Sequence, residues 1–123
     1  MRTRLFKIGA SIGLLGVVLG AFGAHALRPT LEGNQTLESY KTAVLYQFVH
    51  SILIIVIANS PYHSERSSRT ISYLAFLGIL FFSGSLYLLS TMQWSWLGPV
   101  TPVGGLLFMA AWITSILTAK DQD

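Results

Sequence analysis

Apolar residues fall into four long runs along the chain, and short polar stretches separate the runs. They cover residues 5–27, 37–59, 71–90 and 102–119. A transmembrane helix needs about 20 mainly apolar residues, and none of the four runs carries a charged side chain deep inside it. The pattern therefore predicts an all-α integral membrane protein. Its single domain, residues 1–123, is expected to be a bundle of four transmembrane helices.

Local signals predict where these helices begin and end. Pro29 is expected to end the first helix, because a residue before proline is disfavoured in the helical conformation. Thr36 and Thr101 suit the position just before a helix, where a hydroxyl oxygen accepts a backbone N–H bond. Pro102 suits the first helical position.

Composition supports a lipid environment. Hydrophobic residues make up 52% of the chain and charged residues 11%, whereas a soluble domain carries about 25% charged residues. There is no cysteine, which excludes disulfides and thiolate metal sites. The net charge is +3, but the basic residues flank the apolar runs and form no patch with aromatic side chains. The expected partner is therefore the lipid bilayer, and not a nucleic acid.

The distribution of basic residues predicts an orientation. Four spans put both termini on one side, together with the loop near residues 60–70. That side carries six basic residues, Arg2, Arg4, Lys7, Arg66, Arg69 and Lys120, and the other side carries only Arg28 and Lys41. By the positive-inside rule, both termini are expected to face the cytoplasm. The expected location is the plasma (bacterial inner) membrane.

The first run, "IGASIGLLGVVLGAFGAHAL", allows two interpretations. "MRTRLFK" and "AHA" match the charged start and the small-residue cleavage site of a secretory signal peptide. The run is longer than the usual apolar core of about 7–15 residues in such a peptide. Cleavage would also leave its glycines without a helix to pack against, so we expect a retained transmembrane helix.

Five glycines in this run recur at steps of four, three, four and three residues: Gly9, Gly13, Gly16, Gly20 and Gly23. The average step of 3.5 residues places all five on one seam of the helix. Between helices in lipid, small residues allow the close van der Waals contact that drives association. We expect the stripe to be a packing groove for a neighbouring helix, and a flexible gating helix is the alternative.

Polar residues inside the apolar runs are the main candidates for function. Gln47 and His50 share one helix face, and His50 lies about 15 Å below a helix start near Tyr40, close to the bilayer centre. An ionisable residue at that depth is a functional candidate. The structural alternative, which we favour, is a neutral histidine that is hydrogen-bonded across helices, and its candidate partners are Tyr46, Ser83, Ser85, Tyr87 and the indole of Trp112. The candidate intramembrane polar cluster comprises His25, Tyr46, Gln47, His50, Ser83, Ser85 and Tyr87.

Catalytic, metal and haem sites lack the residues they need. His25 and His50 differ in depth by about 12 Å, and His63 lies on the opposite side of the membrane from His25. No carboxylate is present within the spans to complete a metal site or to orient a histidine base. We therefore expect no catalytic residue, no metal ligand and no cofactor.

Four motifs, in order, carry a family resemblance: "GAFGAHAL", "YQFVHS", "FSGSLYLL" and "LGPVTPVGGLLFMAAW". In these motifs and their spacing the chain resembles the YgdD/YwdK-like family, small bacterial membrane proteins of unknown function with eukaryotic relatives. The resemblance covers nearly the whole chain and implies a four-span membrane protein. It implies no activity. The polar and small residues within the motifs are His25, Tyr46, Gln47, His50, Ser83, Gly84, Ser85, Pro99, Thr101, Pro102 and Gly104.

Three functions remain open on the sequence. The first, which we favour, is a non-catalytic membrane protein that acts through contacts with itself, with lipid or with another membrane protein. The second is a small oligomeric transporter or channel with a polar path around His50 and Gln47. The third is an intramembrane enzyme, for which no complete set of catalytic residues is present.

Overall fold

The computed structural model describes residues 1–121, and most of this part of the chain is helical. In chain order the helices are α1 (Arg2–Ala24), α2 (Arg28–Gly33), α3 (Leu37–Ala58), α4 (Glu65–Gly78), the π-helix η1 (Ile79–Ser83), α5 (Gly84–Met92), the 3₁₀ helix η2 (Ser95–Leu97) and α6 (Val100–Thr118). Within the described residues, four helical stretches are long and apolar enough to cross a membrane. The predicted all-α, four-span architecture is confirmed.

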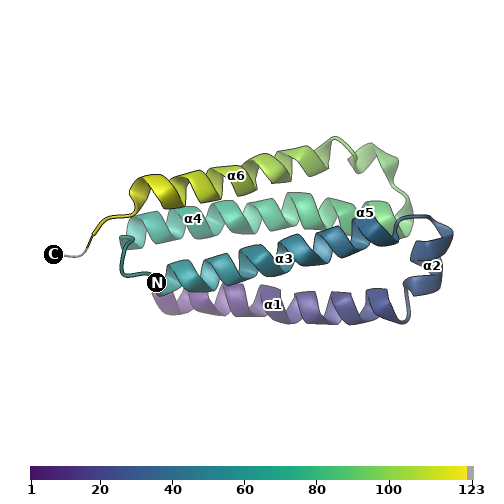
Figure 1. The fold of residues 1–123 in the computed structure, drawn as a ribbon, viewed down its shortest axis with the longest axis horizontal. Helices are drawn as coiled ribbons and strands as arrows, with labels where there is room; N and C mark the ends of the chain where they lie inside the picture. The colour runs from purple at the N-terminus through teal and green to yellow at the C-terminus, as the bar shows by residue number, and fades with distance from the viewer. Residues whose placement is uncertain (122–123) are drawn as a thin grey trace.

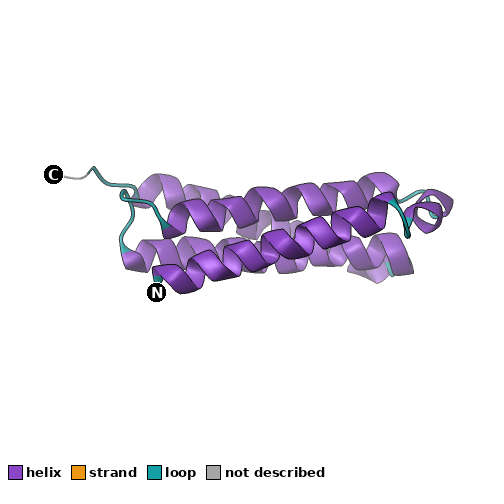
Figure 2. Cartoon of the chain, turned by 90° about the horizontal axis from the view of Figure 1, so that it is seen from below, coloured by secondary structure: helices purple, strands orange, loops and turns teal. Residues whose placement is uncertain are grey.

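The four stretches run up and down, and each packs beside its neighbours in the sequence (Figure 1). α1 packs on α3, α3 packs on the continuous rod formed by α4, η1 and α5, and this rod packs on α6. Figure 2 shows the helices nearly parallel to one long axis from a second side. α1 begins and α6 ends at one end of the bundle, and the short helix α2 lies at the other end (Figure 1).

Two helix ends and one predicted cap differ from the sequence-based expectation. The first helix ends at Ala24, and Pro29 instead lies in the first turn of α2, where its missing N–H is tolerated. Thr36 precedes α3, but its hydroxyl donates to the carbonyl of Ser90 and makes no cap. α6 already begins at Val100, so Thr101 and Pro102 lie inside its first turn. At Pro29 the added short helix α2, and at Thr36 the contact with Ser90, replaces the role that the local signal predicts.

The apolar core lies between α3, α4 and α6. Its largest buried cluster includes Ile54 and Ile57 of α3, Ile71 and Ala75 of α4 and Phe108 of α6. A glycine makes room for the ring: a methyl group added at Gly78 would collide with Phe108. α1 contributes little to this core, and its contact with α3 runs along the glycine stripe.

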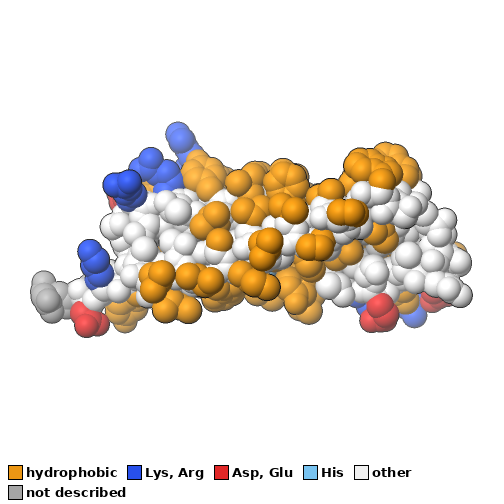
Figure 3. Space-filling view, turned by 90° about the horizontal axis from the view of Figure 1, so that it is seen from above, with side chains coloured by type: hydrophobic (Ala, Val, Ile, Leu, Met, Phe, Trp, Pro, Cys, Tyr) orange, Lys and Arg blue, Asp and Glu red, His pale blue; other side chains and the backbone are white. Residues whose placement is uncertain are grey.

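The surface is banded along the long axis. On the face shown in Figure 3, hydrophobic side chains cover the long central part of the molecule, and basic and acidic side chains gather at its two ends. Many outward residues of α1 and α6 are exposed, including Leu14 at 68% and Leu117 at 77%. Exposed aliphatic side chains along whole helices are typical of a surface in contact with lipid.

Candidate functional site in the bundle interior

The glycine stripe of α1 faces α3 along its whole length. A methyl group at Gly9 would lie 3.0 Å from the carbonyl oxygen of Ser51, and one at Gly16 would lie 2.9 Å from Phe48 Cε1. At Gly13 and Gly20 the corresponding distances, to Ser51 Oγ and Val44 Cγ1, are 3.6 and 3.5 Å, which are ordinary contacts. The contact is therefore tightest at Gly9, Gly16 and Gly23, where Gly9 meets the backbone of α3 and the other two make room for the rings of Phe48 and Tyr40.

Gln47 joins three helices at the centre of the bundle. Its Nε2 donates to the carbonyl of Ile12 on α1 over 2.9 Å. Its Oε1 accepts from the Tyr87 hydroxyl of α5 over 2.5 Å. The side chain is 1% exposed, so both of these bonds are shielded from water. In a buried site of this kind, an amide without partners would cost several kcal/mol, about 2–7.

The glycine stripe leaves backbone carbonyl oxygens of α1 open to hydrogen-bond donors on α3. Within a helix, a carbonyl is flanked by the residue one turn later, and Gly16 stands four residues after Ile12. Gly23 stands four residues after Leu19 in the same way, and the Leu19 carbonyl accepts from the Tyr40 hydroxyl. With no side chain at these glycines, α3 can reach backbone oxygens that a larger residue would cover. The stripe and the polar residues thus form one interface.

His50 uses both ring nitrogens. The indole Nε1 of Trp112 donates to His50 Nε2 over 3.0 Å, and His50 Nδ1 lies 2.8 Å from the carbonyl oxygen of Tyr46. Because an indole N–H can only donate and a carbonyl can only accept, the proton of a neutral ring lies on Nδ1. The Phe108 ring stacks on the imidazole at 3.6 Å between centroids. His50 therefore links α3 to α6 and is 3% exposed.

Ser83 and Ser85 bind different helices. The Ser83 hydroxyl donates to the Ala43 carbonyl of α3 over 2.7 Å. The Ser85 hydroxyl lies 2.6 Å from the Thr101 hydroxyl of α6. The π-helix η1 ends at Ser83 and inserts an extra residue into the turn, which rotates the following helix relative to α4. The two serines consequently tie the third span to the spans on either side of it.

The structure separates His25 from the other predicted cluster residues. His25 follows α1, is exposed and lies beside Ala26 and Phe22 on the outer side of that helix. Tyr46 is 39% exposed, and its ring packs on Phe82 at 4.7 Å between centroids. Its link to the cluster is its carbonyl oxygen, which lies beside His50 Nδ1. Of the remaining five, Gln47 bonds to Tyr87 and lines one groove with Tyr87 and Ser83, whereas His50 and Ser85 each bond to a residue of α6.

Several residues of these networks lie outside the predicted polar cluster. Tyr40 lies seven residues before Gln47 on the same helix face, so extending the face of Gln47 and His50 by two turns would have found it. Asn34 and Thr36 both donate to the Ser90 carbonyl and tie the loop after α2 to α5. No local pattern marks these two as partners of Ser90.

Arg2 forms a second polar network, at the end of the bundle where α1 begins. Its guanidinium donates to the carbonyls of Ala58 and His63 over 3.1 and 2.9 Å. Ala58 is the last residue of α3, where a cation complements the partial negative charge of the helix end. His63 Nε2 lies 2.9 Å from the Ser115 carbonyl of α6. This network joins α1, α3 and α6 across one end.

The polar side chains in the bundle interior are almost all engaged in hydrogen bonds. Within residues 1–121, no three His, Asp or Glu side chains lie close enough together to hold a metal ion. In the same part of the chain, Ser72 Oγ is the one buried side-chain polar atom without a hydrogen-bond partner. Gln47, His50, Ser83, Ser85 and Tyr87 each have partners on another helix. These five side chains and their bonds between helices are called the polar clasp below.

Comparisons with known proteins agree with this architecture. A family described as protein of unknown function (DUF423) matches residues 19–105. A UPF0382 membrane protein of Staphylococcus haemolyticus is 40% identical over 116 residues, which are 94% of each chain. UPF0382 membrane protein YwdK of Bacillus subtilis is also 40% identical, over 91% of this chain and 92% of its own length. A Schizosaccharomyces pombe relative is 32% identical over 92% of this chain and 98% of its own. No solved structure matches.

Proposed function

Because the chain belongs to the DUF423 family of UPF0382 membrane proteins, we propose that it is a non-catalytic membrane protein that acts through contacts of its outward helix faces. The partners are lipid, a second copy of the chain or another membrane protein. One observation carries the proposal. The polar side chains of the bundle centre bond to each other and to backbone, while the outward faces of α1 and α6 are apolar and exposed.

The polar clasp supports a structural role for the intramembrane residues. A catalytic acid or base needs a proton to exchange with substrate. Both nitrogens of His50 are engaged, by Trp112 and by the Tyr46 carbonyl. Both ends of the Gln47 amide are engaged as well. These side chains would have to break interhelical bonds before they could serve a substrate.

One groove favours a second candidate, a small transporter. It has a volume of about 190 Å³ and lies between α1 and the rod of η1 and α5, with Gln47, Ser83 and Tyr87 among its lining residues. Most of the other lining residues are apolar, including Ile12, Leu15 and Leu80. A polar solute would lose its hydration there with few groups to replace it. The groove is therefore better suited to an apolar lipid chain than to the path of a polar solute.

Flux measurements in liposomes separate these two candidates. Wild type and His50→Gln are reconstituted, and proton and solute flux are followed at about pH 5.5 and about pH 7.5, a range in which an unperturbed imidazole changes charge. We expect no flux above protein-free liposomes in either protein at either pH. A wild-type flux that depends on pH and disappears in His50→Gln would overturn the proposal in favour of transport.

The proposed location is the plasma membrane, with both termini in the cytoplasm. Relatives from Staphylococcus, Bacillus and Haemophilus are described as membrane proteins, which supports a bacterial membrane. The orientation is supported by the excess of basic residues at the end where α1 begins and α6 ends, including Arg4, Arg66 and Arg69.

A further inference from the structure

A groove between α1 and α3 lies near the end of the bundle that carries α2. Its volume is about 180 Å³. Small or apolar surface forms most of it, from Gly20, Gly23, Ala24, Tyr40 and Val44. The basic residues Arg28 and Lys41 also line it. An apolar slot bordered by two cations has the shape and charge to take a phosphorylated amphiphile, with its chain inside and its phosphate at the rim.

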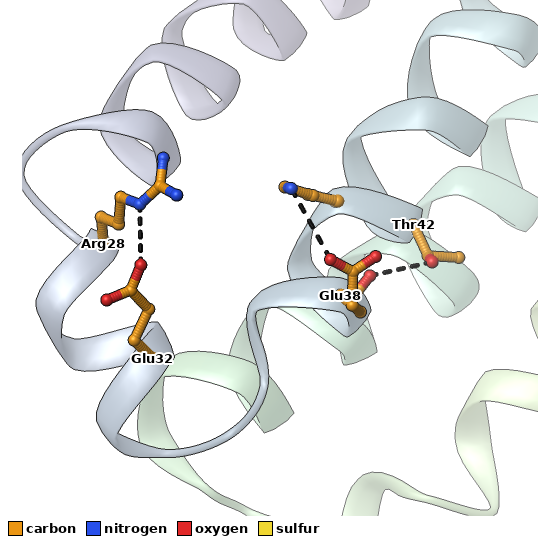
Figure 4. A network of polar contacts seen from close by, with 5 residues as sticks. Arg28, Glu32, Glu38 and Thr42 are labelled. Carbon is orange, nitrogen blue, oxygen red and sulfur yellow. Dashed lines mark hydrogen bonds and ion pairs between the residues drawn. The ribbon is translucent and has the colours of Figure 1, made fainter.

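Each of the two cations that line the groove is paired with a carboxylate beside it, and these four side chains are called the rim. Arg28 Nε pairs with Glu32 Oε1 at 2.8 Å, and Lys41 Nζ lies 3.6 Å from Glu38 Oε1. Figure 4 shows Arg28 and Glu32 on α2, across a gap from Glu38 on the first turn of α3. All four side chains are more than half exposed, so these pairs contribute little to stability and can exchange partners. Arg28 also keeps its two terminal nitrogens outside its pair with Glu32.

This rim lies at the level expected for lipid headgroups. Lys41 is four residues from the start of α3, about 6 Å along the helix axis. Asn34 and Thr36, just before α3, bond to Ser90 near the end of α5. Trp94 and Trp96 follow directly and are 44% and 68% exposed. Tryptophan is enriched at the membrane–water interface, so we expect the rim residues to lie near the headgroups of the same leaflet.

We propose that this groove binds a zwitterionic phospholipid whose headgroup carries a phosphodiester and a primary ammonium, as in phosphatidylethanolamine. Arg28 and Lys41 bind the phosphate, Glu32 and Glu38 accept hydrogen bonds from the ammonium, and an acyl chain lies against Gly20, Gly23 and Ala24. The proposal rests on the proposed function, because it names lipid as one of the contacted partners. The liposome flux measurement and the lipid-binding measurement below are independent, so either proposal can fail alone.

The charge pattern selects this headgroup over two common alternatives. An anionic phospholipid such as phosphatidylglycerol would meet the same two cations, but it would leave Glu32 and Glu38 beside its negative charge. Phosphatidylcholine has the same net charge as phosphatidylethanolamine, but its methylated nitrogen has no N–H to donate to a carboxylate. A headgroup with both a phosphate and a primary ammonium satisfies all four side chains.

Native mass spectrometry of the purified full chain tests the proposal. Phosphatidylethanolamine, phosphatidylglycerol and phosphatidylcholine with identical acyl chains are added in equal amounts, and the lipid retained on the protein is counted. We expect phosphatidylethanolamine to be retained several-fold more than either competitor. Equal retention of the three lipids would overturn the proposal, since the rim would then discriminate none of the headgroup features.

Two double variants at the rim assign the roles of the charges. Arg28→Gln with Lys41→Gln should lower retention of phosphatidylethanolamine several-fold, because the phosphate loses both cations. Glu32→Gln with Glu38→Gln should keep lipid bound but abolish the preference for phosphatidylethanolamine. The matched control is Arg66→Gln with Arg69→Gln, which removes two exposed basic residues at the other end of the bundle. Equal retention by the control and by the Arg28 and Lys41 variant would overturn the site.

Filling the groove tests the acyl-chain position without touching a charge. Ala24 is exposed and lines the groove, so Ala24→Leu adds volume there without pressing on the core. We expect this variant to retain its melting temperature in detergent and to lose most of the retained phosphatidylethanolamine. A variant that melts like wild type and retains as much lipid as wild type would place the acyl chain elsewhere and overturn the assignment.

Discussion

Adjacent residues of α6 show how sharply packing varies from one position to the next. A methyl group added at Gly104 would collide with the backbone of Phe82 in η1. One added at the next residue, Gly105, would lie 4.0 Å from the nearest neighbour, Phe82 Cδ2. A backbone atom cannot rotate away as a side chain can, so the collision at Gly104 is relieved only if two helices separate.

This difference predicts unequal costs for two alanine substitutions. Gly104→Ala should lower the free energy of unfolding by about 1–3 kcal/mol, the usual cost of overpacking. Gly105→Ala, the matched control, should leave it nearly unchanged. Thermal or denaturant unfolding in detergent measures both. Equal stability of the two variants would show that α6 and η1 are not in backbone contact at Gly104.

The hydrogen bond between Trp112 and His50 predicts an energetic coupling. His50→Leu leaves the indole N–H without its partner and should cost roughly 0.6–2 kcal/mol, the range for interhelical hydrogen bonds in membranes. Trp112→Phe should also destabilise. The double variant should cost less than the sum, with a coupling of at least about 0.5 kcal/mol. Strictly additive costs in the same unfolding assay would contradict the bond.

At the scale of helices, each interface of the bundle uses a different device. α1 and α3 meet through glycines and through backbone carbonyls that accept from Gln47 and Tyr40. In the third span, Ser83 at the end of η1 bonds to α3, and Ser85 at the start of α5 bonds to α6. Small residues and hydrogen bonds are needed because lipid supplies little hydrophobic driving force between helices.

The register of α1 on α3 can be tested by cross-linking, because the chain contains no cysteine of its own. A methyl group at Gly20 would lie 3.5 Å from Val44 Cγ1. Gly20→Cys with Val44→Cys should therefore form a disulfide rapidly under mild oxidation in membranes, seen as a shift in gel mobility. Gly20→Cys with Leu117→Cys is the control, since Leu117 lies at the opposite end of the bundle. Similar cross-linking of the two pairs would contradict the interface.

At the scale of the whole molecule, the two ends of the bundle differ. One end holds the beginning of α1, the loop before α4 and the end of α6, clasped by Arg2 and His63. The other end holds α2, the exposed tryptophans and the two ion pairs. The two ends therefore present different chemistry to the two sides of a membrane.

This asymmetry predicts the orientation. A reporter that is active only in the cytoplasm, fused after Asp123, should give full signal, because six of eight basic residues lie in the segments assigned to that side. A reporter active only outside the cytoplasm, fused at the same position, should stay silent. Insertion of each reporter between Gln93 and Trp94 should give the reverse result. If the terminal fusions report the outside instead, the orientation is inverted.

Much of this architecture follows from the sequence alone. Hydropathy over about 20 residues decides whether a helix crosses a bilayer, and the helical period decides which residues share a face. Both are local properties, so the four-span fold could be predicted without coordinates. The same periodicity placed Gln47 with His50 on one face and the five glycines on one seam, which are the positions that face other helices in the structure.

Tertiary structure alone decided which residues meet. Gln47 bonds to Ile12 and Tyr87, and His50 bonds to Trp112, because helix crossings bring those positions to the same depth. His25 stays outside the cluster because α1 ends one residue before it and turns it to the surface. The π-turn of η1 and the pairing of Thr36 with Ser90 have no local signal either. Hydropathy and period act within one helix, whereas these contacts depend on how separate helices are placed against each other.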